Sequence, residues 1–140
     1  MFEVIIWGSD GSEHADRALE CARSLAETNS SELVAMHVKE LLVGRGAGYP
    51  LQVDEEDVEQ RVQEQVKELQ AAGINARYEQ RAVHAGGAAH VIADAAEEVG
   101  AKLIVVGTRG QAPISGLLLG SVTQRLLHVA PCPVLAVPPA

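Results

Sequence analysis

The chain has 140 residues, a formal net charge of −8 at pH 7 and an apolar fraction of 47%. This length and composition indicate one globular domain with its own core, spanning 1–140, rather than a disordered chain. The acidic balance argues against a general binder of nucleic acid or of a membrane surface, because both classes need a basic face.

The charges are unevenly distributed along the chain. The segment from Gly107 to the end contains no Asp or Glu, and Arg109 and Arg125 are its only Arg or Lys residues. An anionic ligand is therefore expected to prefer this segment.

The cysteines and the N-terminus predict a cytoplasmic protein. Cys21 and Cys132 form no C-x-x-C motif and are too few for a disulfide scaffold, so reduced thiols are expected. The N-terminal "MFEVIIWGSD" lacks the basic region of a signal peptide. No apolar run approaches the roughly 20 residues of a membrane span.

The first part of the chain alternates between strand and helix patterns. A β-rich run at 2–8 ends in the turn cluster "GSDGS", and apolar residues then recur at helical spacing after Ser12, the expected N-cap. A second strand is predicted at 32–38. The glycine-containing segment 41–53 has the composition of a loop.

The alternation continues to the C-terminus. A helix is predicted at 54–72, with its acids on a solvated face, followed by an edge strand at 74–83 whose alternate residues are polar. The remaining predicted elements are an alanine-rich helix at 88–99, a buried strand at 102–107, a helix at 119–129 and a closing strand within 131–139. This order predicts an α/β fold with an open parallel sheet and helices on both faces.

Two turns at strand ends carry unusual residues. One is "GSDGS" after the first strand, and the other is "GTRGQAPISGLLLGS", 107–121, after the fourth. Ligands of open α/β sheets bind beyond the carboxyl ends of strands where the strand order reverses. If the first and fourth strands are neighbours, these two turns border one crevice.

The second turn has the composition of a phosphate site. Gly107 and Gly110 let a ligand approach the backbone, while Gly120 and Ser121 stand where the last helix begins and offers free N–H groups. It is not a Walker A loop, which needs Gly-Lys-Ser/Thr. Loop geometry alone is the alternative explanation for the glycines.

The spacing Gly107-x2-Gly110-x9-Gly120-Ser121 resembles the nucleotide-binding signature of the ATP-binding, UspA-type universal stress proteins. The surrounding "SDGSEHADRALECA", "AEEVGAKLIVVGTRG" and "LLLGSVTQRLLHVAPCPVLAV" agree, and the likeness covers 2–138. The resemblance implies a Rossmann-like sheet of order 3-2-1-4-5, similar to adenine nucleotide α-hydrolases. It also implies a homodimer through the last strands and ATP in the crevice.

The resemblance also assigns roles to single residues. Asp10 would meet the ribose or a phosphate-bound Mg²⁺ or Mn²⁺, although a turn aspartate bonded to its own backbone is the alternative. Val38, at the end of the second strand, would border the adenine through its backbone. Arg109 either reaches a phosphate or is an exposed arginine at a strand end.

The glycines and the helix start complete the implied site. Gly107 would lie near the ribose and Gly110 near the phosphates, while Gly120, Ser121 and Val122 would bind phosphate through backbone N–H groups and the serine hydroxyl. Between them, "QAPIS" at 111–115 stands where the family pattern has more basic, glycine-richer text, and its Pro113 removes one N–H and stiffens the loop.

The predicted function is nucleotide binding with little or no catalysis. The segment has no lysine and no evident general base, which phosphoryl transfer would need. The prediction is therefore an ATP-binding regulator or sensor of the stress response that acts on an unidentified protein partner. The alternatives are a dimeric interaction module without nucleotide and a slow ATPase.

Overall fold

The computed structural model describes residues 1–41, 55–84, 87–108 and 119–139. The strands are β1 (Val4–Ser9), β2 (Glu32–Leu41), β3 (Asn75–His84), β4 (Leu103–Gly107) and β5 (Val134–Val137). The helices are α1 (Glu13–Asn29), α2 (Glu55–Ala71), α3 (Ala88–Val99) and α4 (Ser121–Val129). No helix in these ranges is long and apolar enough to cross a membrane.

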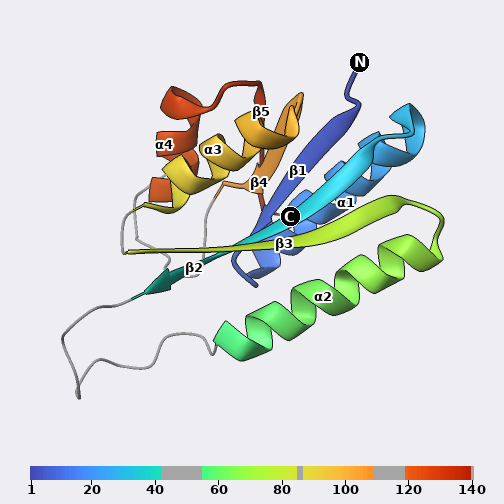
Figure 1. The fold of residues 1–140 in the computed structure, drawn as a ribbon, viewed down its shortest axis with the longest axis horizontal. Helices are drawn as coiled ribbons and strands as arrows, with labels where there is room; N and C mark the ends of the chain where they lie inside the picture. The colour runs from blue at the N-terminus through green and yellow to red at the C-terminus, as the bar shows by residue number, and fades with distance from the viewer. Residues whose placement is uncertain (42–54, 85–86, 109–118, 140) are drawn as a thin grey trace.

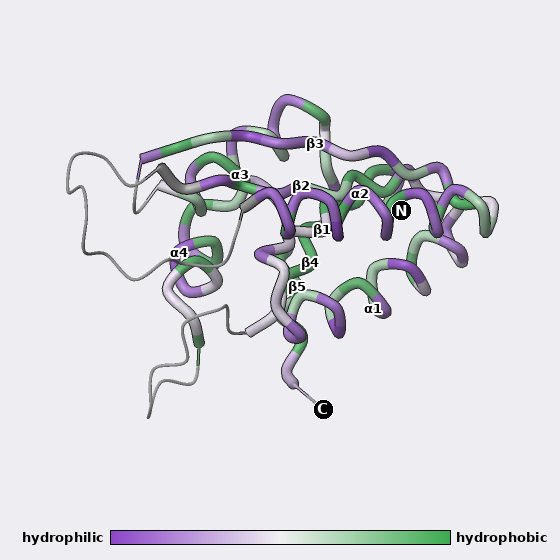
Figure 2. The backbone as a smooth tube through the Cα atoms, turned by 90° about the horizontal axis from the view of Figure 1, so that it is seen from below, coloured by the Kyte–Doolittle hydropathy of each residue, from purple (hydrophilic) through white to green (hydrophobic). Residues whose placement is uncertain are grey.

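The five strands form one parallel sheet in the order β3-β2-β1-β4-β5, which confirms the predicted order. Helices α1 and α2 pack on one face and α3 and α4 on the other (Figure 1). Along the tubes of α1 and α2, hydrophobic and hydrophilic segments alternate, as expected of helices with one face on a sheet (Figure 2).

Alternate residues of the central strands supply the two cores. In β1, Ile5 and Trp7 face α1 and α2, whereas Ile6 faces α3 and α4, and all three side chains are fully buried. The Trp7 Nε1–H donates a hydrogen bond to the Ala15 carbonyl oxygen at 2.8 Å. Trp7 is therefore a core residue whose polar atom is satisfied by α1.

Strand β2 ends three residues later than the sequence predicted, whereas β3 keeps the predicted length and is shifted by one residue. Strands β2 and β3 continue to Leu41 and His84 and pair with each other to those residues, whereas β1 pairs with β2 only as far as Ser9 opposite His37. The two ends project beyond the rest of the sheet (Figure 1). The projecting ends of β2 and β3, called the projecting ribbon below, are stabilised by pairing with each other. The local composition of β2 did not indicate this extension. Residues 42–53 of the predicted loop lie outside the described part of the chain.

Other boundaries are shifted by the local chemistry of the chain. The closing strand is confined to Val134–Val137, because Pro133 and Pro138 flank it and cannot donate to a ladder. Helix α4 begins at Ser121, two residues later than predicted, after Gly120 in an extended conformation.

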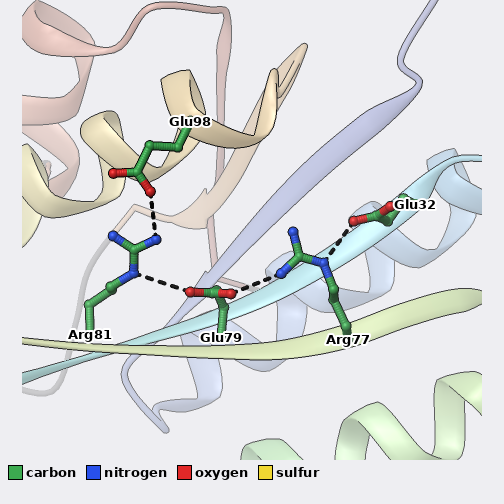
Figure 3. A network of polar contacts seen from close by, with 5 residues as sticks. All are labelled: Glu32, Arg77, Glu79, Arg81 and Glu98. Carbon is green, nitrogen blue, oxygen red and sulfur yellow. Dashed lines mark hydrogen bonds and ion pairs between the residues drawn. The ribbon is translucent and has the colours of Figure 1, made fainter.

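Strand β3 is confirmed as an edge strand and carries a ladder of ion pairs on one face (Figure 3). Arg77 joins Glu32 and Glu79 at 2.8 Å each, and Arg81 joins Glu79 at 3.1 Å and Glu98 of α3 at 2.8 Å. The hydrogen bond to Glu32 raises the pKa of Arg77 above its ordinary value. Charges placed along an edge strand disfavour its pairing with another chain.

Candidate functional site

The two unusual turns lie at the same edge of the sheet. Strands β1 and β4 are parallel neighbours, with Ile5 opposite Leu103 and Trp7 opposite Val105. Their carboxyl ends therefore stand side by side at the point where the strand order reverses, which confirms the adjacency on which the predicted crevice depends.

The turn from β1 to α1 satisfies its own backbone. Ser9 Oγ accepts from the Gly11 N–H at 3.1 Å, Asp10 Oδ1 accepts from the Ser12 N–H at 2.9 Å, and Ser12 Oγ accepts from the Ala15 N–H at 3.2 Å. Ser12 is thus the N-cap, as predicted. The bond from the Ser12 N–H to Asp10 shows that Asp10 fills the alternative role, that of a turn aspartate bonded to the nearby backbone. A ligand role for Asp10 stays a prediction.

Gly107 lies where β4 meets the first turn of α1. A Cβ atom placed on Gly107 would lie 2.8 Å from the His14 carbonyl oxygen and 2.9 Å from its carbonyl carbon. Such distances are too short for any side chain, so helix packing by itself requires glycine here. The predicted position of Gly107 beside a ribose remains a prediction.

Three hydrogen bonds tie the end of β4 to α4 and β5. The Gly120 N–H donates to the Thr108 carbonyl oxygen at 2.6 Å, and the Thr108 N–H donates to the Val137 carbonyl oxygen at 3.0 Å. The Thr123 hydroxyl donates to the Gly107 carbonyl oxygen at 2.7 Å. The structure therefore brings both ends of the glycine motif together, while Arg109 and Gly110 lie outside the described residues.

The start of α4 has no side-chain cap. Its N-cap is Gly120, with φ −69° and ψ 160°, and no side chain bonds the first turn. The N–H of Gly120 is already donated to Thr108, and the first helical bond runs from the Gln124 N–H to the Gly120 carbonyl, so the N–H groups of Ser121, Val122 and Thr123 have no intrahelical acceptor. The phosphate contact of Gly120, Ser121 and Val122 stays a prediction, and of these three the Gly120 N–H is the one that the structure shows bonded within the chain.

The sequence predicted that Val38 ends the second strand, but β2 continues to Leu41. Val38 nevertheless lies beyond the last residue of β2 that pairs with β1. The Glu32 N–H donates to the Glu3 carbonyl oxygen at 2.9 Å, so Glu32 directs its backbone groups toward β1. Every second residue of a strand has the same orientation, which brings the Val38 carbonyl to the side of β1. Since β1 pairs only to Ser9, this carbonyl borders the crevice rather than the middle of the ladder.

Comparisons with known proteins agree with this geometry. The sequence matches the profile of the Universal stress protein family across residues 1–138. The chain belongs to the universal stress protein family. A universal stress protein of Thermus aquaticus is 36% identical over 139 residues, covering 98% of this chain and 99% of that one. Universal stress protein YxiE of Bacillus subtilis is 31% identical, covering 98% and 99%.

Solved structures give the same fold. Protein MJ0577 of Methanocaldococcus jannaschii has a TM-score of 0.81 at 22% identity, covering 100% of this chain and 98% of its own. A universal stress protein in complex with cAMP has a TM-score of 0.67 at 27% identity, covering 99% and 98%.

Two polar residues beside the crevice of this universal stress protein had no role in the sequence analysis. Thr123 and His37 are 4% and 2% exposed, and His37 Nδ1 lies 3.3 Å from the Ser9 carbonyl oxygen. The sequence could have indicated that Thr123 is buried, because it lies three residues before Leu126 and therefore on the same, buried face of α4. Within the described ranges, no three His, Cys, Asp or Glu side chains are grouped closely enough to hold a metal.

Proposed function

We propose that this universal stress protein binds an adenine nucleotide, ATP with Mg²⁺ or Mn²⁺, in the crevice between the ends of β1 and β4, and that it does so as a regulator or sensor. The observation that carries the proposal is the uncapped start of α4, which is fastened to the end of β4. A helix start with free N–H groups at a strand-order reversal suits a phosphate.

The phosphate end would be built from backbone and one hydroxyl. Ser121 and Val122 supply N–H groups, and Ser121 is exposed, so its hydroxyl is accessible to a phosphate oxygen. Asp10, in the facing turn, is the candidate to bind a phosphate-bound Mg²⁺ or the ribose, because a hard cation prefers carboxylate oxygen. Arg109 and Gly110 belong to the proposed site on the family motif alone.

The adenine end would use the projecting ribbon. The Val38 carbonyl faces the crevice beyond the last pairing of β1, and a backbone carbonyl can accept from the adenine amino group. The solved relative in complex with cAMP binds an adenine nucleotide on the same fold, which supports this class of ligand.

Binding without efficient turnover is the form of activity that the described groups support best. Phosphoryl transfer requires neutralisation of the phosphate charge and a positioned nucleophile. The lysines of the chain are Lys39, Lys67 and Lys102, and none belongs to the two turns. The bound nucleotide would instead set the conformation that a protein partner recognises.

The β5 edge is the proposed dimer contact. Strand β5 closes the sheet opposite β3, and its Leu135 is 37% exposed. Unlike β3, this edge carries no charged residue. We expect a homodimer in a cytoplasmic setting, and sedimentation equilibrium of the wild-type protein tests it, with a monomer at tens of micromolar as the contrary result.

The deciding experiment is nucleotide extraction followed by titration. The protein is purified, denatured by heat and its supernatant chromatographed, and the emptied protein is titrated with ATP and Mg²⁺ by calorimetry. Adenine nucleotide in near-stoichiometric amount, or binding of ATP, supports the proposal. Neither release nor binding at millimolar ATP supports a nucleotide-free interaction module. Steady phosphate release that Asp10→Ala abolishes would indicate a slow ATPase.

A further inference from the structure

We infer that Thr123 is a positioning residue for the phosphate end of the proposed site, acting through the backbone of α4 rather than by touching the ligand. The inference rests on the proposed nucleotide binding. It assigns a role to a buried hydroxyl that lies outside the glycine motif.

Two bonds hold the first turn of α4, one on each side of the N–H groups that would bind phosphate. The Gly120 N–H is bonded to Thr108 O at 2.6 Å, and the Thr123 hydroxyl is bonded to Gly107 O at 2.7 Å. Ser121 and Val122 lie between these two ties. The end of β4 thereby sets both the position and the direction of their N–H groups.

The two hydrogen bonds differ in whether they require a particular side chain. The bond from Gly120 is between backbone groups and is available to any residue except proline. The bond from Thr123 needs a hydroxyl at that one position. A threonine inside a helix ordinarily bonds back to a carbonyl of its own helix, but here the hydroxyl reaches across to the last residue of β4. Of the two hydrogen bonds that hold the first turn of α4, the Thr123 bond is thus the one that depends on a particular side chain.

The carbonyl that Thr123 holds belongs to a residue with little freedom to move. Gly107 is pressed against the His14 backbone, and the next residue, Thr108, is bonded to β5 through its N–H. The Thr123 hydroxyl is therefore anchored to a part of the β4 end that is held by both α1 and β5. Loss of the bond would let α4 tilt about the remaining tie at Gly120 while the end of β4 stays in place.

A purely structural role predicts a different pattern of effects. Thr123 is buried beside Leu126 on the core face of α4, so its replacement will cost some stability whatever its role in binding. A general loosening of the fold would weaken every ligand alike. A misplaced pair of N–H groups would weaken only ligands that carry phosphate.

The test compares ATP with adenosine, a ligand without phosphate, in calorimetric titrations of the wild type, Thr123→Val and Thr123→Ser. Valine keeps the shape and removes the hydroxyl, whereas serine keeps the hydroxyl. We expect Thr123→Val to weaken ATP binding about tenfold, the effect of one lost or misplaced hydrogen bond. Adenosine binding should stay within about twofold, and Thr123→Ser should recover most of the ATP affinity.

Ser31→Ala is the matched control. Ser31 is 2% exposed and its hydroxyl also donates to a backbone carbonyl, that of Phe2, but at the opposite end of the sheet. This variant should lose stability while its ratio of ATP to adenosine affinity stays at the wild-type value.

Unchanged ATP affinity in Thr123→Val, an equal loss for both ligands, or failure of Thr123→Ser to recover binding would each overturn the inference. If the valine variant does not fold, Thr123→Ala is put through the same comparison. A wild-type protein that binds neither ligand would instead refute the proposed function, so the two failures are distinct.

Discussion

The two helices that begin at the crevice, α1 and α4, start in nearly the same backbone conformation and yet are capped in different ways. Their N-cap residues have φ and ψ of −82° and 165° at Ser12, and −69° and 160° at Gly120. Ser12 bonds the first turn of its helix through its hydroxyl, whereas Gly120 has no side chain with which to do so.

This difference separates a helix start that the chain caps with its own side chain from one without such a cap, which is where we propose that phosphate binds. Serine and aspartate are favoured N-caps because their oxygens satisfy N–H groups that the helix cannot. At α1 the protein itself supplies those oxygens. At α4 the glycine leaves the N–H groups to an external acceptor, and the conformation does not require glycine, because its φ is negative.

The largest expected loss of stability comes from the contact between Gly107, at the end of β4, and the His14 backbone in the first turn of α1. Gly107→Ala should lower the free energy of unfolding by about 2 kcal/mol, because the new methyl group meets the His14 backbone at 2.8 Å. Urea denaturation measures it. Gly8→Ala is the control, since its methyl group would meet side-chain atoms, with Val106 the nearest at 3.1 Å. An equal or greater loss in the control would contradict the packing role of Gly107.

Removal of the α1 cap should have a smaller effect on stability. Ser12→Ala deletes the acceptor for the Ala15 N–H and should cost about 1 kcal/mol in the free energy of unfolding. The parallel change at the other helix, Ser121→Ala, should leave stability within about 0.5 kcal/mol because Ser121 caps nothing. Equal losses in the two variants, measured by urea denaturation, would show that the two helix starts do not differ.

A side-chain cap at the start of α4 should raise stability and weaken ATP binding. Gly120→Ser places a hydroxyl on a backbone that already has the Ser12 conformation, so stability should rise by a few tenths of a kcal/mol. The same hydroxyl would accept from the N–H of Val122 or Thr123 and would stand in front of the helix start, so ATP binding should weaken several-fold. Thermal unfolding and calorimetry measure the two changes in one variant. A gain in stability with ATP affinity intact would mean that phosphate does not use this helix start.

The smallest change in stability is expected at Asp10. Asp10→Asn keeps an acceptor oxygen for the Ser12 N–H, so the free energy of unfolding should change by less than about 0.5 kcal/mol. The neutral amide is a poorer ligand for Mg²⁺, and ATP binding should lose its dependence on the metal. Titrations with Mg²⁺ and with EDTA measure this. If Mg²⁺ strengthens ATP binding equally in both proteins, Asp10 does not bind the metal.

Much of the fold could be predicted from short-range patterns, and the resemblance implied the strand order. The alternation of strand and helix and the N-cap at Ser12 were visible in the sequence and are confirmed. The end of β2 was not, because its last residues pair with residues of β3 that lie more than 40 positions away. The C-cap of α1 at Ser30, with φ 53°, was also missed, since a left-handed serine has no strong local signal.

The candidate site was only partly predictable. The spacing of the motif assigned Gly107 and Gly120 to one site, and the structure brings the start of α4 to the end of β4. The sequence did not show that the N–H of Gly120 would already be bonded, nor that Thr123 would reach across to Gly107. Those facts depend on the angle at which α4 meets the sheet.

The sequence by itself determined the order and type of the elements and indicated the place in the chain where we propose a phosphate site, because those properties follow from the local periodicity and chemistry of neighbouring residues. Only the tertiary structure decided which backbone groups remain open to a ligand. Gly107 touches His14 from 93 positions away, and Thr123 bonds Gly107 from 16 positions away. Such contacts are set by the packing of whole helices on the sheet, which no short stretch of the chain specifies.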